Sequence, residues 1–273
     1  MINFLLKIPY YFSKALDKIK LEKHSKSFSN FDEAKKYCDS INPDSYENKD
    51  LNQYRYEKFI NNLDLIPISY SNSSKLLLET LLIYLQYEKS LPKILDLGGV
   101  FGENQLYLKH LIQKNLIYDV VECDQIISLS KSKNFSHSKF FTSITEAKKN
   151  SNYDIIFSAG TIQYFRKPYE TIEEMFSTKA KFIGLSRNNF SNDEKIYSEP
   201  SFMENHGGNE SHIIFKYKNP KTVILYPNTQ INEDKLNKIA HKHNYTLLRK
   251  SKGIEGNYGT NSYTNDLVFK LNK

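Results

Sequence analysis

Short apolar runs alternate along the middle of the chain with segments whose apolar residues recur at helical spacing. The apolar runs have the length of strands and cover residues 93–99, 118–124, 139–143, 153–160 and 181–187. The helical patterns cover residues 74–87, 103–114 and 168–177, where Pro168 suits a first turn. Strands that alternate with helices in this way predict an α/β fold with a doubly wound, mostly parallel sheet.

The alternation is interrupted between residues 188 and 227. Two alternating runs, 212–218 and 222–226, flank a turn at Asn219-Pro220, which predicts an inserted hairpin. After the insertion, residues 233–244 have a helical pattern, and residues 246–250 and 266–271 read as a closing antiparallel pair. The sequence thus predicts a seven-stranded sheet with an antiparallel C-terminal strand.

Residues 1–70 precede this pattern and are expected to form an N-terminal helical extension and cap, with the main domain at residues 71–273. Residues 4–19 interleave aromatic and leucine residues with lysines. Such a helix either packs on its own domain or a dimer partner, or associates weakly with an anionic membrane. The segment lacks a charged leader and a cleavage site, so it does not resemble a signal peptide.

The composition indicates the cellular compartment of the protein and its net charge. Only Cys38 and Cys123 are present, which excludes a disulfide scaffold and predicts a cytoplasmic protein. Cys123 reads as a packed thiol more readily than as a nucleophile. The net charge of +7 favours anionic partners, but the lysines are scattered and also fit a compositional bias of the source. No oligomeric state follows from the sequence.

Glycines and a carboxylate mark the ends of three predicted strands. Gly98 and Gly99 end the strand at 93–99, and Gly102 precedes the next helix. Glu122 lies 24 positions after Gly98, close to the spacing at which a carboxylate accepts hydrogen bonds from ribose hydroxyls. The strand at 153–160 also ends in small residues. Because open α/β sheets bind ligands at these strand ends, an adenosine-bearing cofactor is expected.

At these residues the sequence resembles the class I S-adenosylmethionine-dependent methyltransferases, and within them a bacterial family associated with capsule and lipopolysaccharide biosynthesis. The resemblance covers about residues 30 to 250 and is carried by segments 95–102, 120–122, 154–164 and 182–187, with Pro168-Tyr169. The commoner loop is Asp-x-Gly-x-Gly-x-Gly. Here Val100 replaces the middle glycine and Gly99 is added, as in the narrower family.

The resemblance implies a Rossmann-like fold, S-adenosylmethionine as cofactor, and O-methylation of a sugar hydroxyl or phosphate-type oxygen in a surface-polysaccharide precursor. Asp96 would order the loop or the methionine amino group. The expected cofactor-binding residues are Asp96, Gly98, Gly99, Gly102, Glu122, Cys123, Ser143, Ser158, Ala159 and Gly160. The expected acceptor-binding residues are Gln163, Tyr164, Arg187 and Tyr56.

The catalytic candidates depend on the acceptor. A sugar hydroxyl needs a general base, for which His206 comes first and His212 second, because imidazole titrates near neutral pH. An anionic oxygen needs no base, and Arg187 would hold it through a bidentate contact. No spaced cluster of histidine, cysteine or carboxylate side chains predicts a metal site.

Two other functions stay open at this point. A NAD-dependent nucleotide-sugar dehydrogenase or epimerase would use a similar glycine turn, but residues 98–102 do not fit Gly-x-Gly-x-x-Gly. A nucleic-acid-binding module would need a concentrated basic face with interleaved aromatic residues, which the scattered lysines do not provide. We therefore expect a small-molecule acceptor and no nucleic acid.

Overall fold

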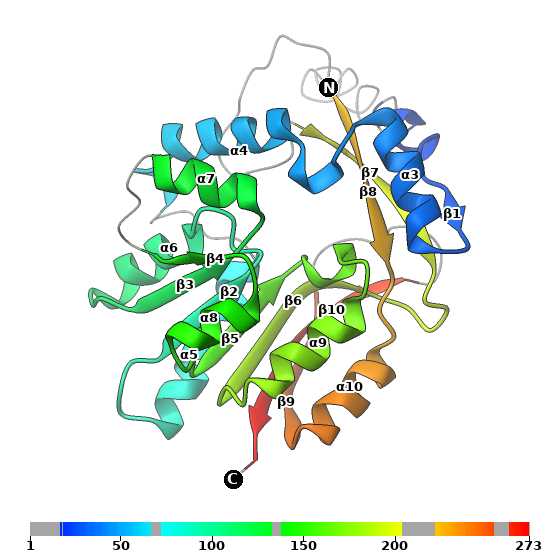
Figure 1. Ribbon diagram of the computed structural model, residues 1–273. Helices are drawn as coiled ribbons and strands as arrows, with labels where there is room; N and C mark the ends of the chain where they lie inside the picture. The colour runs from blue at the N-terminus through cyan, green and yellow to red at the C-terminus, as the bar shows by residue number, and fades with distance from the viewer. Residues whose placement is uncertain are drawn as a thin grey trace, which may run out of the picture.

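The computed structural model describes residues 17, 19–66, 72–132, 138–203, 222–253 and 262–272, and it contains two sheets (Figure 1). The larger sheet has seven strands in the order β4-β3-β2-β5-β6-β10-β9. The strands are β2 (Lys93–Leu97), β3 (Ile117–Val121), β4 (Phe140–Phe141), β5 (Ile155–Ala159), β6 (Phe182–Phe190), β9 (Tyr245–Lys252) and β10 (Tyr263–Leu271). Neighbours from β4 to β6 are parallel, and β10 is antiparallel to both β6 and β9. The predicted fold class is confirmed.

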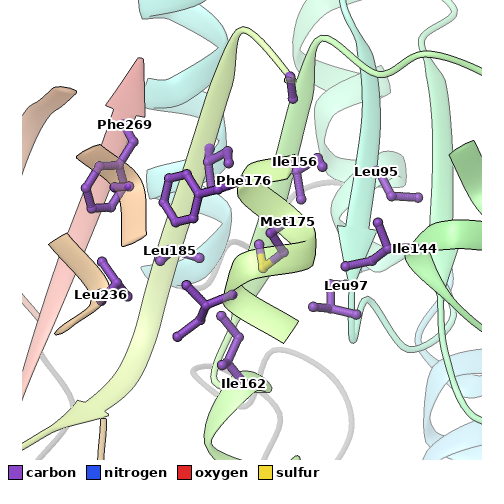
Figure 2. Close-up of a cluster of buried hydrophobic side chains, with 14 of the residues drawn as sticks. Leu95, Leu97, Ile144, Ile156, Ile162, Met175, Phe176, Leu185, Leu236 and Phe269 are labelled. Carbon is purple, nitrogen blue, oxygen red and sulfur yellow. The ribbon is translucent and has the colours of Figure 1, made fainter. Parts of the chain in front are cut away.

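Helices cover both faces of this sheet. They are α5 (Asn72–Tyr87), α6 (Glu103–Ile112), α7 (Asp124–Ser132), α8 (Ile144–Asn150), α9 (Pro168–Ser177) and α10 (Glu233–Lys242). Successive strand residues point to opposite faces, so Leu95 joins the core under α8, α9 and α10, shown in Figure 2, while Ile94 joins the core under α5 and α6. Both layers bury apolar area, which is the main stabilising term.

Two elements differ from the sequence-based expectation. The strand predicted at 118–124 ends at Val121, and α7 begins at Asp124, so a helix was missed. Its sequence has three serines among nine residues, and serine favours helix ends over helix interiors, which hid the helical pattern. The strand predicted at 139–143 is reduced to two residues, Phe140–Phe141.

The second sheet contains β1 (Ser27–Phe28), β7 (Ile196–Phe202) and β8 (Val223–Thr229), in the order β1-β7-β8. An antiparallel pair therefore occupies the predicted insertion, but β8 pairs with β7 and not with the run at 212–218, which lies outside the described residues. Pro200 lies inside β7 and removes a backbone donor, so the strand carried no clear sequence signal.

The N-terminal elements connect the two sheets. α3 (Phe31–Ile41) begins after its N-cap Asn30 and packs on β7 and β8, and α4 (Lys49–Asn61) follows the short helix η1 (Ser45–Glu47). α4 lies against α7, near the carboxyl ends of the parallel strands (Figure 1). Of residues 4–19, expected to form an amphipathic helix, only 17 and 19 are described. Within the described segments, no helix combines the length and hydropathy needed to cross a membrane.

The aromatic packing around Phe176 gives a stability prediction. Its ring is fully buried, with ring centroids 5.0 Å from Tyr245 and 5.2 Å from Phe269, both edge-on. Phe176→Ala leaves a cavity between α9 and the sheet and is expected to lower the free energy of unfolding by about 3–5 kcal/mol. Urea unfolding followed by circular dichroism measures the change. Phe165→Ala, at a ring that is 36% exposed, should change it by about 0.5 kcal/mol, and equal losses would contradict the assignment.

Candidate functional site

The carboxyl ends of the parallel strands form the candidate site. Backbone bonds hold neighbouring ends together: the Gly98 N–H donates to the Val121 carbonyl at 2.9 Å, and the Gly160 N–H donates to the Ser186 carbonyl at 2.8 Å. The loops that follow β2, β3 and β5 therefore leave the sheet side by side. This edge is where open α/β sheets bind ligands.

The loop after β2 is narrow and requires glycine. Gly98 has φ +79°, and a Cβ atom there would lie 2.0 Å from the Thr161 Oγ1 atom, so a side chain is excluded. Gly102 has φ +80° and is the N-cap of α6, and its N–H donates to the Gly99 carbonyl at 2.9 Å. Because Gly98 and Gly102 have no side chains, a ligand above the loop can approach the backbone closely.

The middle of the loop is strained at Val100. Val100 has φ +48°, a region that β-branched residues rarely adopt, whereas Gly99 has no positive φ. Gly99 is required for a different reason, because a Cβ there would lie 2.6 Å from the Asp96 Oδ2 atom. Valine therefore occupies the position of positive φ, and glycine occupies a position that has no room for a side chain. The Val100 N–H donates to Glu122 Oε1 at 3.1 Å, which holds the strained residue in place.

Glu122 faces the same loop from the end of β3. Its Oε1 accepts from Val100, and its Oε2 accepts from the Cys123 N–H at 2.9 Å. Each carboxylate oxygen accepts up to two hydrogen bonds, so both can still accept one hydroxyl. Burial raises the pKa of Glu122, while the Cys123 N–H and the Arg55 charge oppose the shift. These features fit the two neighbouring hydroxyls of a ribose.

Asp96 lies beneath the loop, on the sheet face covered by α6, and is only 2% exposed. Its Oδ2 accepts from the Tyr118 hydroxyl at 2.5 Å and from Asn104 Nδ2 at 3.2 Å. Burial raises the pKa of Asp96 to about 6, against the effect of these two bonds. The contacts are those of a residue that orders the loop.

Three further candidates use their polar atoms within the protein. The Ser158 hydroxyl is fully buried and donates to the Leu97 carbonyl at 3.1 Å, which joins β5 to β2. The Ser143 hydroxyl accepts from the Glu146 N–H at 3.1 Å and caps α8. Burial raises the pKa of Cys123 to about 11, so its thiol is protonated at neutral pH. Ala159 and Gly160 are half-buried at the end of β5.

α4 covers the glycine loop. The rings of Tyr56 and Phe59 pack on Phe101 of the loop, with centroids 5.6 Å and 5.2 Å away, and the cluster continues to Ile126 of α7. Tyr56 is buried in this apolar cluster, and burial raises the pKa of its hydroxyl. Its position is that of a cover over the loop.

A tyrosine cluster, composed of Tyr46, Tyr164 and Tyr226, lies where η1, η3 (Ile162–Tyr164) and β8 meet. The Tyr46 ring lies 4.7 Å from Tyr164 and 4.4 Å from Tyr226. The Tyr164 hydroxyl donates to Glu199 Oε2 at 2.9 Å, and the Arg55 guanidinium stacks over Tyr46 at 5.0 Å. Only Tyr164 was among the candidates. The residues around it, Tyr46, Arg55, Glu199 and Tyr226, come from segments that meet only in the folded chain.

Two acceptor candidates flank the end of β5. The Gln163 Oε1 atom accepts from the Asn189 N–H at 3.0 Å and ties η3 to β6. Arg187 is exposed and has φ +57°, because β6 carries one extra residue between the pairs Leu185–Leu267 and Asn188–Asn265. Its side chain lies against Gly160, which has φ +64°. This bulge directs Arg187 to the strand ends.

His206 and His212, the expected bases, lie outside the described residues. Among the residues that are described, no group of three or more histidine, cysteine or acidic side chains is placed to hold a metal ion. The site that the structure brings together thus has a glycine loop, the Glu122 carboxylate that faces it, a covering helix and a polar aromatic cluster.

Comparison with known proteins places the fold. No family model and no curated protein matches the sequence. An S-adenosylmethionine-dependent methyltransferase from Clostridium acetobutylicum matches the structure with a TM-score of 0.50 and 13% identity, over 80% of this chain and 99% of that chain. The CcbJ methyltransferase from Streptomyces caelestis gives 0.46 and 11%, over 80% and 98%. Magnesium protoporphyrin IX methyltransferase from Synechocystis with bound SAM gives 0.44 and 12%, over 81% and 95%.

The match to the Clostridium protein identifies the fold. The chain has the Rossmann-like α/β fold of the Clostridium methyltransferase, with the mostly parallel seven-stranded sheet described above.

Asp96 gives a pH-dependent prediction. Its pKa in the fold, about 6, exceeds its ordinary value of 3.8, so its contribution to stability is complete below about pH 3.8 and is lost as the pH rises through 6. Asp96→Asn keeps an oxygen for both donors and cannot ionise. The free energy of unfolding of the variant minus that of the wild type should therefore increase by about 2 kcal/mol from pH 4.5 to pH 7.5. Urea titrations at both pH values measure this, and a constant difference would contradict the burial argument.

Proposed function

We propose that this protein is an S-adenosylmethionine-dependent methyltransferase. The observation that carries the proposal is the pairing of a glycine loop, closed to side chains at Gly98, with the Glu122 carboxylate at the same edge of the sheet. The methyltransferase fold and the motif resemblance support it. A protein that binds another adenosine cofactor would have a similar loop and carboxylate. The strand order of the sheet therefore has to distinguish a methyltransferase from these alternatives.

The sheet disfavours the dehydrogenase alternative. The doubly wound dinucleotide fold has the parallel strand order 3-2-1-4-5-6. Here the antiparallel β10 lies between β6 and β9, which departs from that order. A nucleic-acid-binding function gains no support from the site, where an apolar cluster on α4 covers the glycine loop.

The residues have distinct tasks when the cofactor is bound. The cofactor supplies a methyl group on a sulfonium sulfur. Glu122 accepts the ribose hydroxyls, Gly98 and its neighbours let the ligand approach the backbone, and Asp96 fixes the loop from below. α4 excludes water from above through Tyr56. Such positioning contributes strongly to a displacement reaction, because it removes the entropy cost of aligning the reactants.

The proposed acceptor is a small molecule, with O-methylation of a sugar hydroxyl or a phosphate-type oxygen of a surface-polysaccharide precursor. Arg187, at the exposed bulge beside Gly160, supports an anionic group on the acceptor. Aromatic and carboxylate groups near Tyr164 and Glu199 suit a polyhydroxylated molecule. For a hydroxyl acceptor, the new bond from oxygen to the methyl carbon would form as the bond from that carbon to the cofactor's sulfur breaks, which leaves a neutral thioether, and the hydroxyl proton would pass to a base on the protein. Glu199 joins His206 and His212 as a candidate for that base.

Binding of S-adenosylhomocysteine tests the proposal by calorimetry. We expect micromolar affinity for the wild type and no binding of NAD. Glu122→Gln removes the charge that accepts the ribose hydroxyls, so its affinity should fall by about 10- to 100-fold. The matched control is Glu170→Gln, at an exposed glutamate that pairs with Lys167 on α9, and it should bind as the wild type does.

The opposite pattern would reject the proposal. If NAD binds and S-adenosylhomocysteine does not, the dehydrogenase alternative replaces the methyltransferase. If Glu122→Gln and Glu170→Gln both retain the wild-type affinity, Glu122 does not hold the ribose.

A further inference from the structure

Val100 lies between two neighbours that are fixed by different parts of the molecule. Gly99, before it, has no room for a side chain above the Asp96 carboxylate. Phe101, after it, is fully buried, and its ring packs with two aromatic rings of α4 at centroid distances of 5.2 Å and 5.6 Å. Between them Val100 has φ +48°. A β-branched residue rarely adopts positive φ, so this conformation persists only because the contacts around it hold it.

The side chain and the backbone of Val100 make two of these contacts. The side chain packs against the apolar cluster that contains Tyr56 and Phe59 of α4 and Ile126 of α7. The Val100 N–H donates to Glu122 Oε1 at 3.1 Å. Val100 therefore links the apolar cluster to the carboxylate, because the cluster holds its side chain and the carboxylate holds its backbone.

Cys123 has the same arrangement at the other oxygen of Glu122. Its N–H donates to Glu122 Oε2 at 2.9 Å, and its side chain packs against the same apolar cluster. These two hydrogen bonds therefore come from residues whose side chains pack on the cluster that α4 completes. Hydrogen bonds to a carboxylate are stronger than those between neutral groups. The orientation of Glu122 thus depends on how the cluster holds Val100 and Cys123.

We propose that Val100 is a positioning residue for Glu122. Packing of its side chain on the apolar cluster directs its N–H to the carboxylate, and the carboxylate is thereby oriented for the ribose diol. This inference rests on the proposed function and deepens it, because it makes recognition of the diol depend on the docking of α4. It also gives a reason for a strained valine where the commoner loop has a glycine. Glycine adopts positive φ freely but has no side chain for the cluster to hold.

Two probes that differ only in the ribose hydroxyls test the proposal by calorimetry. S-adenosylhomocysteine carries the diol, and its 2′,3′-dideoxy analogue does not. For the wild type, the dissociation constant of the analogue should exceed that of S-adenosylhomocysteine by about 10- to 100-fold. Val100→Gly removes the side chain and still allows positive φ, so this ratio should fall by about 3- to 10-fold through weaker binding of S-adenosylhomocysteine. The affinity for the analogue should stay within about twofold, which shows that the variant is folded.

The control removes a different side chain from the same apolar cluster. Leu106 packs against the cluster from α6, and Leu106→Ala should leave the ratio within about twofold of the wild-type value. If Val100→Gly keeps the wild-type ratio, or if Leu106→Ala lowers the ratio as much, the assignment is overturned while the proposed function stands. A wild-type ratio near one would also overturn it, because Glu122 would then not hold the diol. If the wild type binds neither probe, the proposed function itself fails.

Discussion

The close approach of Gly98 and Thr161 is the constraint on which the site depends. β2 and β5 are paired neighbours. The buried Ser158 hydroxyl of β5 donates to the carbonyl of Leu97, the last residue of β2, where the loop leaves the sheet. A Cβ atom added to Gly98 would lie 2.0 Å from the Thr161 hydroxyl oxygen. The loops after β2 and β5 are therefore in direct contact where they leave the sheet. The loop that this contact fixes donates to Glu122 through Val100 and packs under α4 through Phe101.

Unfavourable local features collect around this edge. Val100 and Arg187 have positive φ, and Asp96 and Arg55 place ionisable groups in buried positions. The backbone strain costs of the order of 1–3 kcal/mol at each of the two residues, and an uncompensated buried charge costs several kcal/mol. The two cores on the faces of the sheet consist of apolar residues in regular helices and strands. The stability of those cores supports a strained and charged edge, a distribution typical of functional sites.

The local signals in the sequence predicted most of the large sheet and the glycine loop that Glu122 faces. Apolar periodicity is a property of each segment, and the glycines and Glu122 lie within 24 positions of one another. The tyrosine cluster and its contact with Glu199 escaped prediction because Tyr46, Glu199 and Tyr226 are brought to Tyr164 from distant segments. No spacing rule links such residues, and Pro200 concealed the strand that carries Glu199. The burial of Arg55 depends on how α4 docks, which no local pattern in the sequence shows.

The loop also shows why an unusual glycine pattern can be tolerated. Glycine at Val100 would remove the strain, but Gly99 must stay small because of the Asp96 carboxylate below it. The Glu122 carboxylate compensates by accepting the Val100 N–H, and this leaves lone pairs on both of its oxygens. A diol can therefore bind without breaking the bonds that hold the loop. If the proposed function holds, ligand binding would require no rearrangement of Glu122, and this organisation of the loop would reduce the conformational cost of binding.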